Sequence, residues 1–178
     1  MNETLQTIHA RYTCRAFKPN QPPSHEHLLT VANAALTSPS AMNRQPWHFI
    51  LLKNRELIAE LEQTGLDKIK ADPDQRIWER LKARGGTLFY GAPCMLVIAS
   101  ADSAVDCGIA TQTATLAAAS LGIDSCICAL ADLCYHDELA ARVGIPEGYT
   151  HGLTLLLGYA KTPGQPREND TAKLTVVE

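Results

Sequence analysis

An uninterrupted run of six apolar residues at positions 94–99, Cys-Met-Leu-Val-Ile-Ala, constrains the fold of this chain more than any other feature. A short, continuous apolar run is typical of a strand in the interior of a sheet. The pair Ala92-Pro93 stands just before it and marks where the strand begins. The run therefore predicts a central strand, and a second run at 47–52 predicts another strand that is buried on both faces.

Helices are expected between and around these strands. Ser24 and Asn54 are suitable N-caps, and Gly122 is a suitable C-terminal stop. The predicted helices cover residues 24–36, 54–61 (ending around Gly65), 72–84, 102–121 and 133–143. Further strands are predicted at 124–130 and 153–157, and the apolar residues at 174–177 predict a last strand in the tail. This mixture implies an α+β or layered α-β-α fold rather than a repeated βαβ pattern.

Composition excludes several classes of protein. The 178 residues suffice for one domain, with 46% hydrophobic and 20% charged residues. A net charge of −3 provides no broad basic surface for nucleic acid. No segment reaches the roughly 18 apolar residues of a membrane-spanning helix. Because residues 1–4 lack the basic start of a signal peptide, we expect a cytoplasmic protein.

The chain has six cysteines, which are spread along it and lie mostly in apolar surroundings. We expect them to be buried and reduced, since free cysteine behaves as a small apolar residue. A zinc site formed by Cys126, Cys128, Cys134 and His136 is the alternative. Its spacing matches no standard metal-binding pattern, so no metal is predicted.

Two guanidinium groups and a hydroxyl occur within five residues in the segment 11–15, Arg-Tyr-Thr-Cys-Arg. Arginine stays charged at any working pH and presents paired donors that match phosphate oxygens. The segment therefore predicts a phosphate-binding site. Cys14 lies between the two arginines, and their positive charge is expected to lower the pKa of its thiol.

A polar loop at positions 38–48, Ser-Pro-Ser-Ala-Met-Asn-Arg-Gln-Pro-Trp-His, leads directly into the predicted strand at 47–52. Its prolines restrict the backbone, and its serine and asparagine side chains supply hydrogen-bond donors and acceptors. Together with the predicted phosphate site, this loop indicates a phosphorylated, planar cofactor.

Taken in order, these segments resemble the nitroreductase family of flavoproteins. Residues 11–15 are similar to the family's R-[RYH]-[ST]-x-R signature, and residues 38–47 to its A-P-S-x-x-N-x-Q-P-W loop. Residues 89–93, 106–122 and 144–149 resemble its A-P strand entry, its long central helix and its G-I-P-E-G-Y turn. The resemblance extends over nearly the whole chain and identifies it as a short, single-domain member.

The resemblance implies a three-layer α-β-α sandwich whose central, mostly antiparallel sheet is flanked by helices. It also implies FMN bound without a covalent bond, in a homodimer with two active sites at the interface. The chain would then form one FMN-binding domain over residues 1–178, with residues 163–178 as an extended tail on the partner subunit.

The family's phosphate and ribityl contacts correspond in this sequence to Arg11, Thr13 and Arg15, and Tyr12 between them is also expected to bind the cofactor. Arg167 matches a late basic residue that closes on the phosphate.

The family's remaining flavin contacts correspond to two further segments. From the other subunit, the resemblance implies contacts by Pro39, Ser40, Ala41 and Asn43, with Gln45 in the same loop. Along the flavin edge near N5, it implies Ile127, Cys128 and Ala129. Ala129-Leu130 stands where the family often has a glycine, so the surroundings of N5 are where this sequence departs from the family.

The chemistry implied is hydride transfer from NADH or NADPH to flavin N5, followed by transfer to a nitroaromatic, quinone or activated-alkene acceptor in a ping-pong cycle. Such a site needs no catalytic residue from the protein, because the cofactor carries the reaction. The sequence has no Ser-His-Asp, H-E-x-x-H or G-x-G-x-x-G pattern. The alternative is a flavin carrier or sensor of the same fold without efficient turnover.

Overall fold

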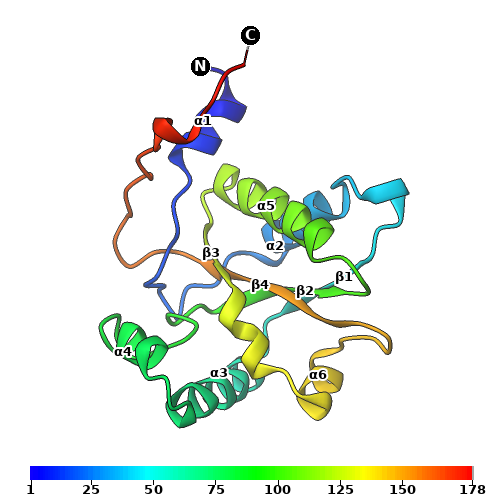
Figure 1. Cartoon of the computed structure of the whole chain (residues 1–178), viewed down its shortest axis with the longest axis vertical. Helices are drawn as coiled ribbons and strands as arrows, with labels where there is room; N and C mark the ends of the chain where they lie inside the picture. Colours follow the sequence, from blue (N-terminus) through cyan, green and yellow to red (C-terminus); the bar gives the residue numbers. More distant parts are fainter. Residues whose placement is uncertain (178) are drawn as a thin grey trace.

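The computed structural model describes residues 1–177. Its centre is one antiparallel sheet with the strand order β1-β2-β4-β3 (Figure 1). The strands are β1 (Trp47–Leu52), β2 (Cys94–Ser100), β3 (Asp124–Cys128) and β4 (Thr150–Gly158). The predicted α+β fold with an antiparallel sheet is confirmed.

Strand β2 lies in the interior of the sheet, and every one of its residues is buried. Strand β1 occupies an edge of the sheet, where only Trp47 and Leu52 are buried. Both faces of the strand pack against the core as predicted, since Trp47 belongs to one core cluster and Leu52 to the other. Its middle residues are only half-buried because the strand lies at the edge. His48 is exposed on this strand.

Helices cover both faces of the sheet, which gives three layers (Figure 1). One layer holds α2 (His25–Leu36) and α5 (Ala104–Ser120), and the other holds α3 (Arg55–Ala71) and the 3-10 helix η2 (Ala129–Cys134). The alternation of side chains along β2 divides the core accordingly. Leu96 and Ile98 pack with α2 and α5, whereas Met95 and Val97 pack with α3.

Helix α5 approaches the sheet closely because its inward face consists of small residues. Ala110, Ala114 and Ala118 follow one another at intervals of four and are fully buried. Residues at this spacing lie on one side of a helix, which allows α5 to pack closely on the sheet. Ser103 caps its first turn by accepting a hydrogen bond from the Asp106 N–H at 3.2 Å.

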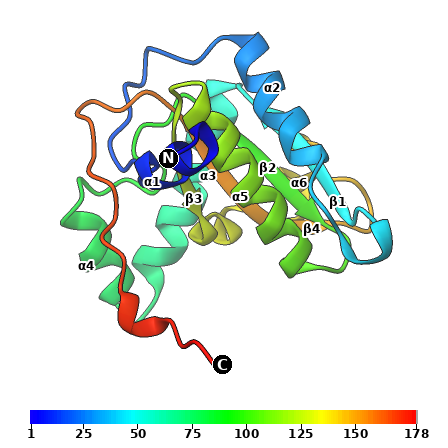
Figure 2. The same ribbon diagram turned by 90° about the horizontal axis from the view of Figure 1, so that it is seen from above.

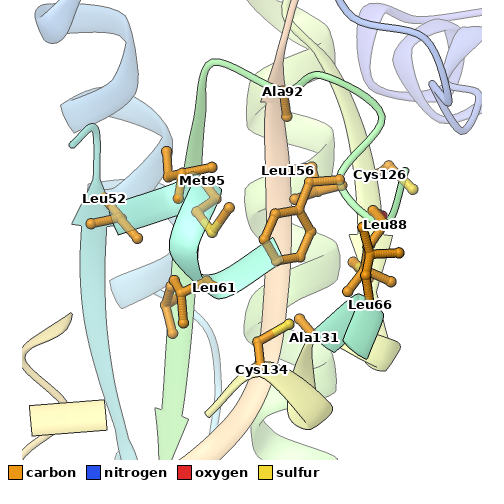
Figure 3. Packing of buried hydrophobic residues seen from close by; sticks show 14 of the residues in the cluster. Leu52, Leu61, Leu66, Leu88, Ala92, Met95, Cys126, Ala131, Cys134 and Leu156 are labelled. Atoms are coloured by element: carbon orange, nitrogen blue, oxygen red, sulfur yellow. The ribbon is translucent and has the colours of Figure 1, made fainter. Parts of the chain in front are cut away.

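The core below the sheet joins β2 and β4 to α3 and η2 (Figure 3). Helix α3 runs through Gly65 instead of ending there as predicted. A Cβ atom at Gly65 would lie 2.6 Å from Cys134 Sγ and 2.8 Å from Leu88 Cδ2. The glycine therefore allows η2 and the segment before β2 to pack directly on the α3 backbone.

The remaining elements are α1 (Glu3–Ala10), η1 (Ala41–Asn43), α4 (Arg76–Lys82), α6 (Asp137–Val143) and η3 (Thr171–Lys173). Strand β3 ends at Cys128, two residues earlier than predicted, because η2 begins there. Residues 163–177 contain no strand, so the strand predicted in the tail is wrong for this chain on its own. No helix among the described residues is both long and apolar enough to cross a membrane.

All six cysteines are buried and free. Burial raises the pKa of the Cys94, Cys126 and Cys134 thiols to about 12. It also raises the pKa of Cys14, which contradicts the lowering expected from Arg11 and Arg15. The Cys14 side chain points into the core, where the loss of solvation and the nearby Asp124 carboxylate both disfavour the thiolate. Within residues 1–177, no group of three or more His, Cys, Asp or Glu residues is arranged to hold a metal ion.

Replacing Gly65 with alanine should destabilise the protein by about 1–3 kcal/mol, because the added methyl group has no space beside Cys134 and Leu88. Gly108→Ala on α5 is the matched control, since a Cβ atom there meets no other atom within 4 Å. Urea unfolding of the two variants would measure the difference. Equal stabilities would contradict the packing described here.

Candidate functional site

The segment 11–15 leaves α1 and runs alongside the outer edge of β3. Thr13 forms a parallel bridge with Ser125, and the Cys14 N–H donates to the Ser125 carbonyl oxygen at 2.9 Å. This pairing fixes which way each side chain points, because neighbours along an extended backbone face opposite sides. Cys14 turns into the core, while Thr13 and Arg15 are exposed. The sheet edge thus presents the polar side chains of this segment to solvent.

Arg11 lies between two adjacent clefts. The first has a volume of about 320 Å³ and is lined by Tyr12, Ser120 and Asp124 among others. The second has a volume of about 400 Å³, and Arg167 and Lys173 from the tail line it together with His9 of α1. The structure thus brings Arg11 and Arg167 to one cleft, although 155 residues separate them in the sequence. Glu168 and Asp170 line the same cleft, and the Lys173 ammonium group pairs with Asp170 at 3.5 Å. The guanidinium groups of Arg11 and Arg167 are the donors there that suit a phosphate group.

Ile127, Cys128 and Ala129 lie further along the same sheet edge. Ile127 is 42% exposed, and Ala129 is exposed at the start of η2. The Cys128 side chain points into the core instead, so only its backbone faces the edge. The structure therefore brings residues 11–15 and residues 127–129 to one side of the molecule.

The loop from Pro39 to Gln45 joins α2 to β1, and three of its residues adopt left-handed backbone conformations. Met42, Asn43 and Gln45 have φ values of 52°, 54° and 48°. Such conformations are unfavourable for residues other than glycine and are found mainly at functional sites.

The loop's own polar groups hold this conformation in place. The Ser40 Oγ accepts the Gln45 N–H at 2.9 Å, and the Gln45 Nε2 donates to Asn43 Oδ1 at 3.1 Å. Pro39, Ala41, Asn43 and Gln45 are exposed, so the loop is a fixed but accessible polar surface.

Helix α5 anchors this loop. The buried Asp106 carboxylate accepts the Ala41 N–H at 3.3 Å, and the Ser38 Oγ donates to Thr113 Oγ1 at 2.9 Å. Arg44 pairs with Asp102 at 2.7 Å. The sequence analysis missed Asp106. The pattern Ser103-x-x-Asp106 marks a helix start, but it does not show that the carboxylate reaches a loop 65 residues earlier.

Within one chain, the loop 39–45 and the segment 11–15 lie at opposite corners of the sheet (Figure 1). The loop precedes Trp47, which pairs with Ser100 at the end of β2. The segment pairs with Ser125, which lies opposite Leu157 and hence level with Cys94 at the start of β2. Because the segment lies outside β3, four strand spacings and six residue steps separate it from the loop, by about 19 Å across the sheet and about 20 Å along it. A single chain does not bring these two groups of predicted residues together.

A buried polar group outside these segments connects η2 to β4. The His151 side chain stacks on Tyr135 with ring centroids 4.5 Å apart, and it contacts Thr154 Oγ1 at 2.9 Å and Asp132 Oδ1 at 3.3 Å. Burial lowers the pKa of His151, so the ring is neutral near pH 7. These contacts fix η2, whose first residue is Ala129.

Trp78 on α4 packs against the core that lies between the sheet and α3. The ammonium groups of Lys70 and Lys82 lie 5.0 and 5.7 Å from the centroid of its ring. Cation–π contacts of this kind stabilise the position of the ring. Trp78 thus anchors the short helix to the body of the protein.

Comparisons with known proteins agree with this geometry. The sequence profile of the nitroreductase family matches residues 8–159. A putative NADH dehydrogenase/NAD(P)H nitroreductase of Archaeoglobus fulgidus is 30% identical, covering 90% of this chain and 87% of that protein.

Among solved structures, an FMN-bound nitroreductase from Desulfitobacterium hafniense is 46% identical, with a TM-score of 0.97 over 100% of both chains. An FMN-bound nitroreductase from Bacteroides fragilis is 26% identical, with a TM-score of 0.89, again over 100% of both chains. The match of the family profile to most of the chain, on the fold described above, shows that this protein belongs to the nitroreductase family.

Proposed function

We propose that this protein is an FMN-dependent oxidoreductase that takes hydride from NADH or NADPH and passes it to a small oxidised acceptor. The observation that carries the proposal is the placement of Arg11 and Arg167 on one cleft beside the exposed edge of β3. The 46% identity to a protein solved with bound FMN, over both full chains, supports it.

The residues of the cleft and of the neighbouring sheet edge fit the chemistry of FMN. Arg11 and Arg167 provide charged donors for its phosphate, and Thr13 and Arg15 are exposed beside them for the phosphate and ribityl hydroxyls. The backbone at residues 127–129 would border the flavin ring at the sheet edge. When bound, FMN supplies the hydride-accepting and hydride-donating chemistry, and the protein contributes position and electrostatics.

We further propose that the functional unit is a homodimer. Residues 39–45 lie too far from Arg11 in one chain to share a cofactor with it, so a second copy would supply them. Helix α1 supports this proposal, because none of its residues is buried even though it carries Leu5 and Ile8. The exposed apolar residues include Leu5, Ile8, Leu29, Leu36, Met42, Val105, Ile109, Leu174, Val176 and Val177. A second copy of the chain that packed on these residues would remove their apolar side chains from contact with water.

The tail fits the same arrangement. Residues 163–177 run outside the sheet and its covering helices in both views (Figures 1 and 2). Leu174, Val176 and Val177 are each at least 73% exposed there. Under this proposal residues 1–178 form one domain, and the tail packs on the partner subunit.

The acceptors that fit are nitroaromatics, quinones and activated alkenes, reduced in a ping-pong cycle in which donor and acceptor use the same flavin face in turn. The protein offers no competing nucleophile, since all six thiols are buried. Six free cysteines also fit the reducing conditions of the cytoplasm, where we place the protein.

The purified protein should show the absorption spectrum of an oxidised flavin, and anaerobic addition of NADH or NADPH should bleach it within the time of a catalytic turnover. Stopped-flow spectroscopy at several nucleotide concentrations would measure the rate and the preferred donor. A flavin that stays oxidised for minutes with both nucleotides would favour a flavin carrier or sensor. A protein that does not bind FMN would exclude both functions.

Replacing Arg11 and Arg167 together with alanine should weaken FMN binding at least a hundredfold, since each charge-assisted contact contributes about 1.5–3 kcal/mol. Quenching of FMN fluorescence on titration would give the dissociation constant. The control is Arg76→Ala with Arg142→Ala, which removes the same charge from exposed ion pairs far from the cleft. Equal affinities of the two double variants would contradict the phosphate assignment.

Leu5→Asp should convert the dimer into a monomer, because it places a charge on the apolar face of α1 that the partner would cover. The fold of each chain should survive, since Leu5 is 45% exposed in a single chain. Light scattering after size-exclusion chromatography would measure the mass. Gln63→Asp, an exposed position on α3 in the opposite layer, should leave the dimer intact. A dimeric Leu5→Asp variant would contradict the proposed interface.

A further inference from the structure

The ring of Tyr12 lies directly against the backbone of Gly164. A Cβ atom at Gly164 would stand 2.2 Å from Tyr12 Cδ2, 2.3 Å from Cε2 and 2.9 Å from Cγ. Cβ atoms essentially never come closer than 3.0 Å to a neighbour, so even alanine would require the ring or the backbone to move. Gly164 is not in the left-handed backbone region, so the requirement there is space rather than conformation.

Gly164 lies just after the last residues that are hydrogen-bonded to the sheet and to the segment after α1. The Lys18 N–H donates to the Tyr159 carbonyl at 2.8 Å, and the Lys161 N–H donates to the Ala16 carbonyl at 2.8 Å. Among residues 1–177, the hydrogen bonds formed beyond Gly164 all join residues of the tail to one another. The course of the tail therefore depends on the contacts that the chain makes near Gly164.

The same contact is adjacent in sequence to both arginines of the cleft. Arg11 immediately precedes Tyr12, and Arg167 follows Gly164 by three residues. Three residues of extended chain span at most about 11 Å, so a shift of Gly164 is passed on to Arg167 over a short distance. The Tyr12–Gly164 contact is therefore close in sequence to both arginines that line the cleft.

We propose that Tyr12 and Gly164 form a latch that holds Arg11 and Arg167 on one cleft, and that Tyr12 is a positioning residue rather than a ligand of the cofactor. The proposal rests on the proposed function for the identity of the phosphate that the two arginines bind. It assigns to Gly164 a role that only a residue without a side chain can fill.

The surroundings of Tyr12 agree with this role. Burial and the neighbouring Asp124 carboxylate raise the pKa of Tyr12 to about 12, so the phenol stays neutral near pH 7. Asp124 also accepts the Ala160 N–H at 2.7 Å. Asp124 thus contacts both Tyr12 and the segment that leads to Gly164. Its carboxylate connects the two sides of the latch.

Gly164→Ala tests the latch in the purified full-length protein. It should raise the dissociation constant for FMN at least tenfold, because Arg167 leaves the cleft. In protein stripped of flavin, trypsin should release the fragment beginning at Glu168 at least fivefold faster. Gly108→Ala is the matched control, since a Cβ atom there meets nothing within 4 Å. Unchanged affinity together with an unchanged cleavage rate would overturn the proposal.

A double-mutant cycle separates the latch from a general loss of folding. Tyr12→Ala should weaken FMN binding to a similar degree, and adding Gly164→Ala to it should change affinity less than twofold, because the ring that the methyl group strikes is gone. Tyr12→Phe keeps the ring and should bind FMN within threefold of the unmodified protein. Additive effects of Tyr12→Ala and Gly164→Ala would overturn the proposed contact.

The same substitution in an Arg167→Ala protein tests whether the latch acts on FMN binding through Arg167. In an Arg167→Ala protein, Gly164→Ala should change FMN affinity less than twofold, since the group that it displaces is absent. A further tenfold loss there would overturn the claim that the latch acts through Arg167. If the unmodified protein binds no FMN but Gly164→Ala still speeds cleavage of the tail, the proposed function fails and the positional role of the latch stands.

Discussion

The packing of strand β2 between two helical layers is the constraint on which the rest of the structure depends. Each of its residues is buried, with Leu96 and Ile98 on one side and Met95 and Val97 on the other. A strand with apolar side chains on both faces requires cover on both faces, because apolar surface exposed to water is unfavourable. The neighbouring strands β1 and β4 form hydrogen bonds with its backbone, and the helices cover its apolar side chains.

The sheet in turn determines where the candidate site lies. Its antiparallel order places the segment 11–15 along β3 and the loop 39–45 before β1, at diagonally opposite corners. Each corner is well formed by itself. The loop is held by Asp106 and by its own hydrogen bonds, and the arginine cleft is closed by the tail. Both features leave polar groups exposed, which is consistent with a cofactor shared between two copies of the chain.

Several glycines of this protein leave no space for a Cβ atom, and two of these contacts bear directly on the core and on the candidate site. At Gly65 the backbone of α3 meets Cys134 and Leu88, and at Gly164 the tail meets the ring of Tyr12. Neither position needs the left-handed backbone that usually explains a glycine. What they share is the absence of space for a Cβ atom. The first contact holds a core together, and the second directs an arginine to the candidate phosphate site.

The sequence by itself determined the class of fold, the central strand, most helices and the family, because these depend on local periodicity and on short motifs. It did not reveal that β1 is an edge strand, that α3 continues through Gly65, or that Cys14 points into the core. Each of these depends on what lies opposite the residue in space. Burial raised the pKa of the Cys14 thiol, although the arginines beside it in the sequence predicted a lowered pKa. The placement of Arg11 and Arg167 on one cleft depends on where the tail lies, and the separation of Arg11 from residues 39–45 follows from the strand order. Only the tertiary structure decided them, because distance along a chain does not fix distance across a sheet.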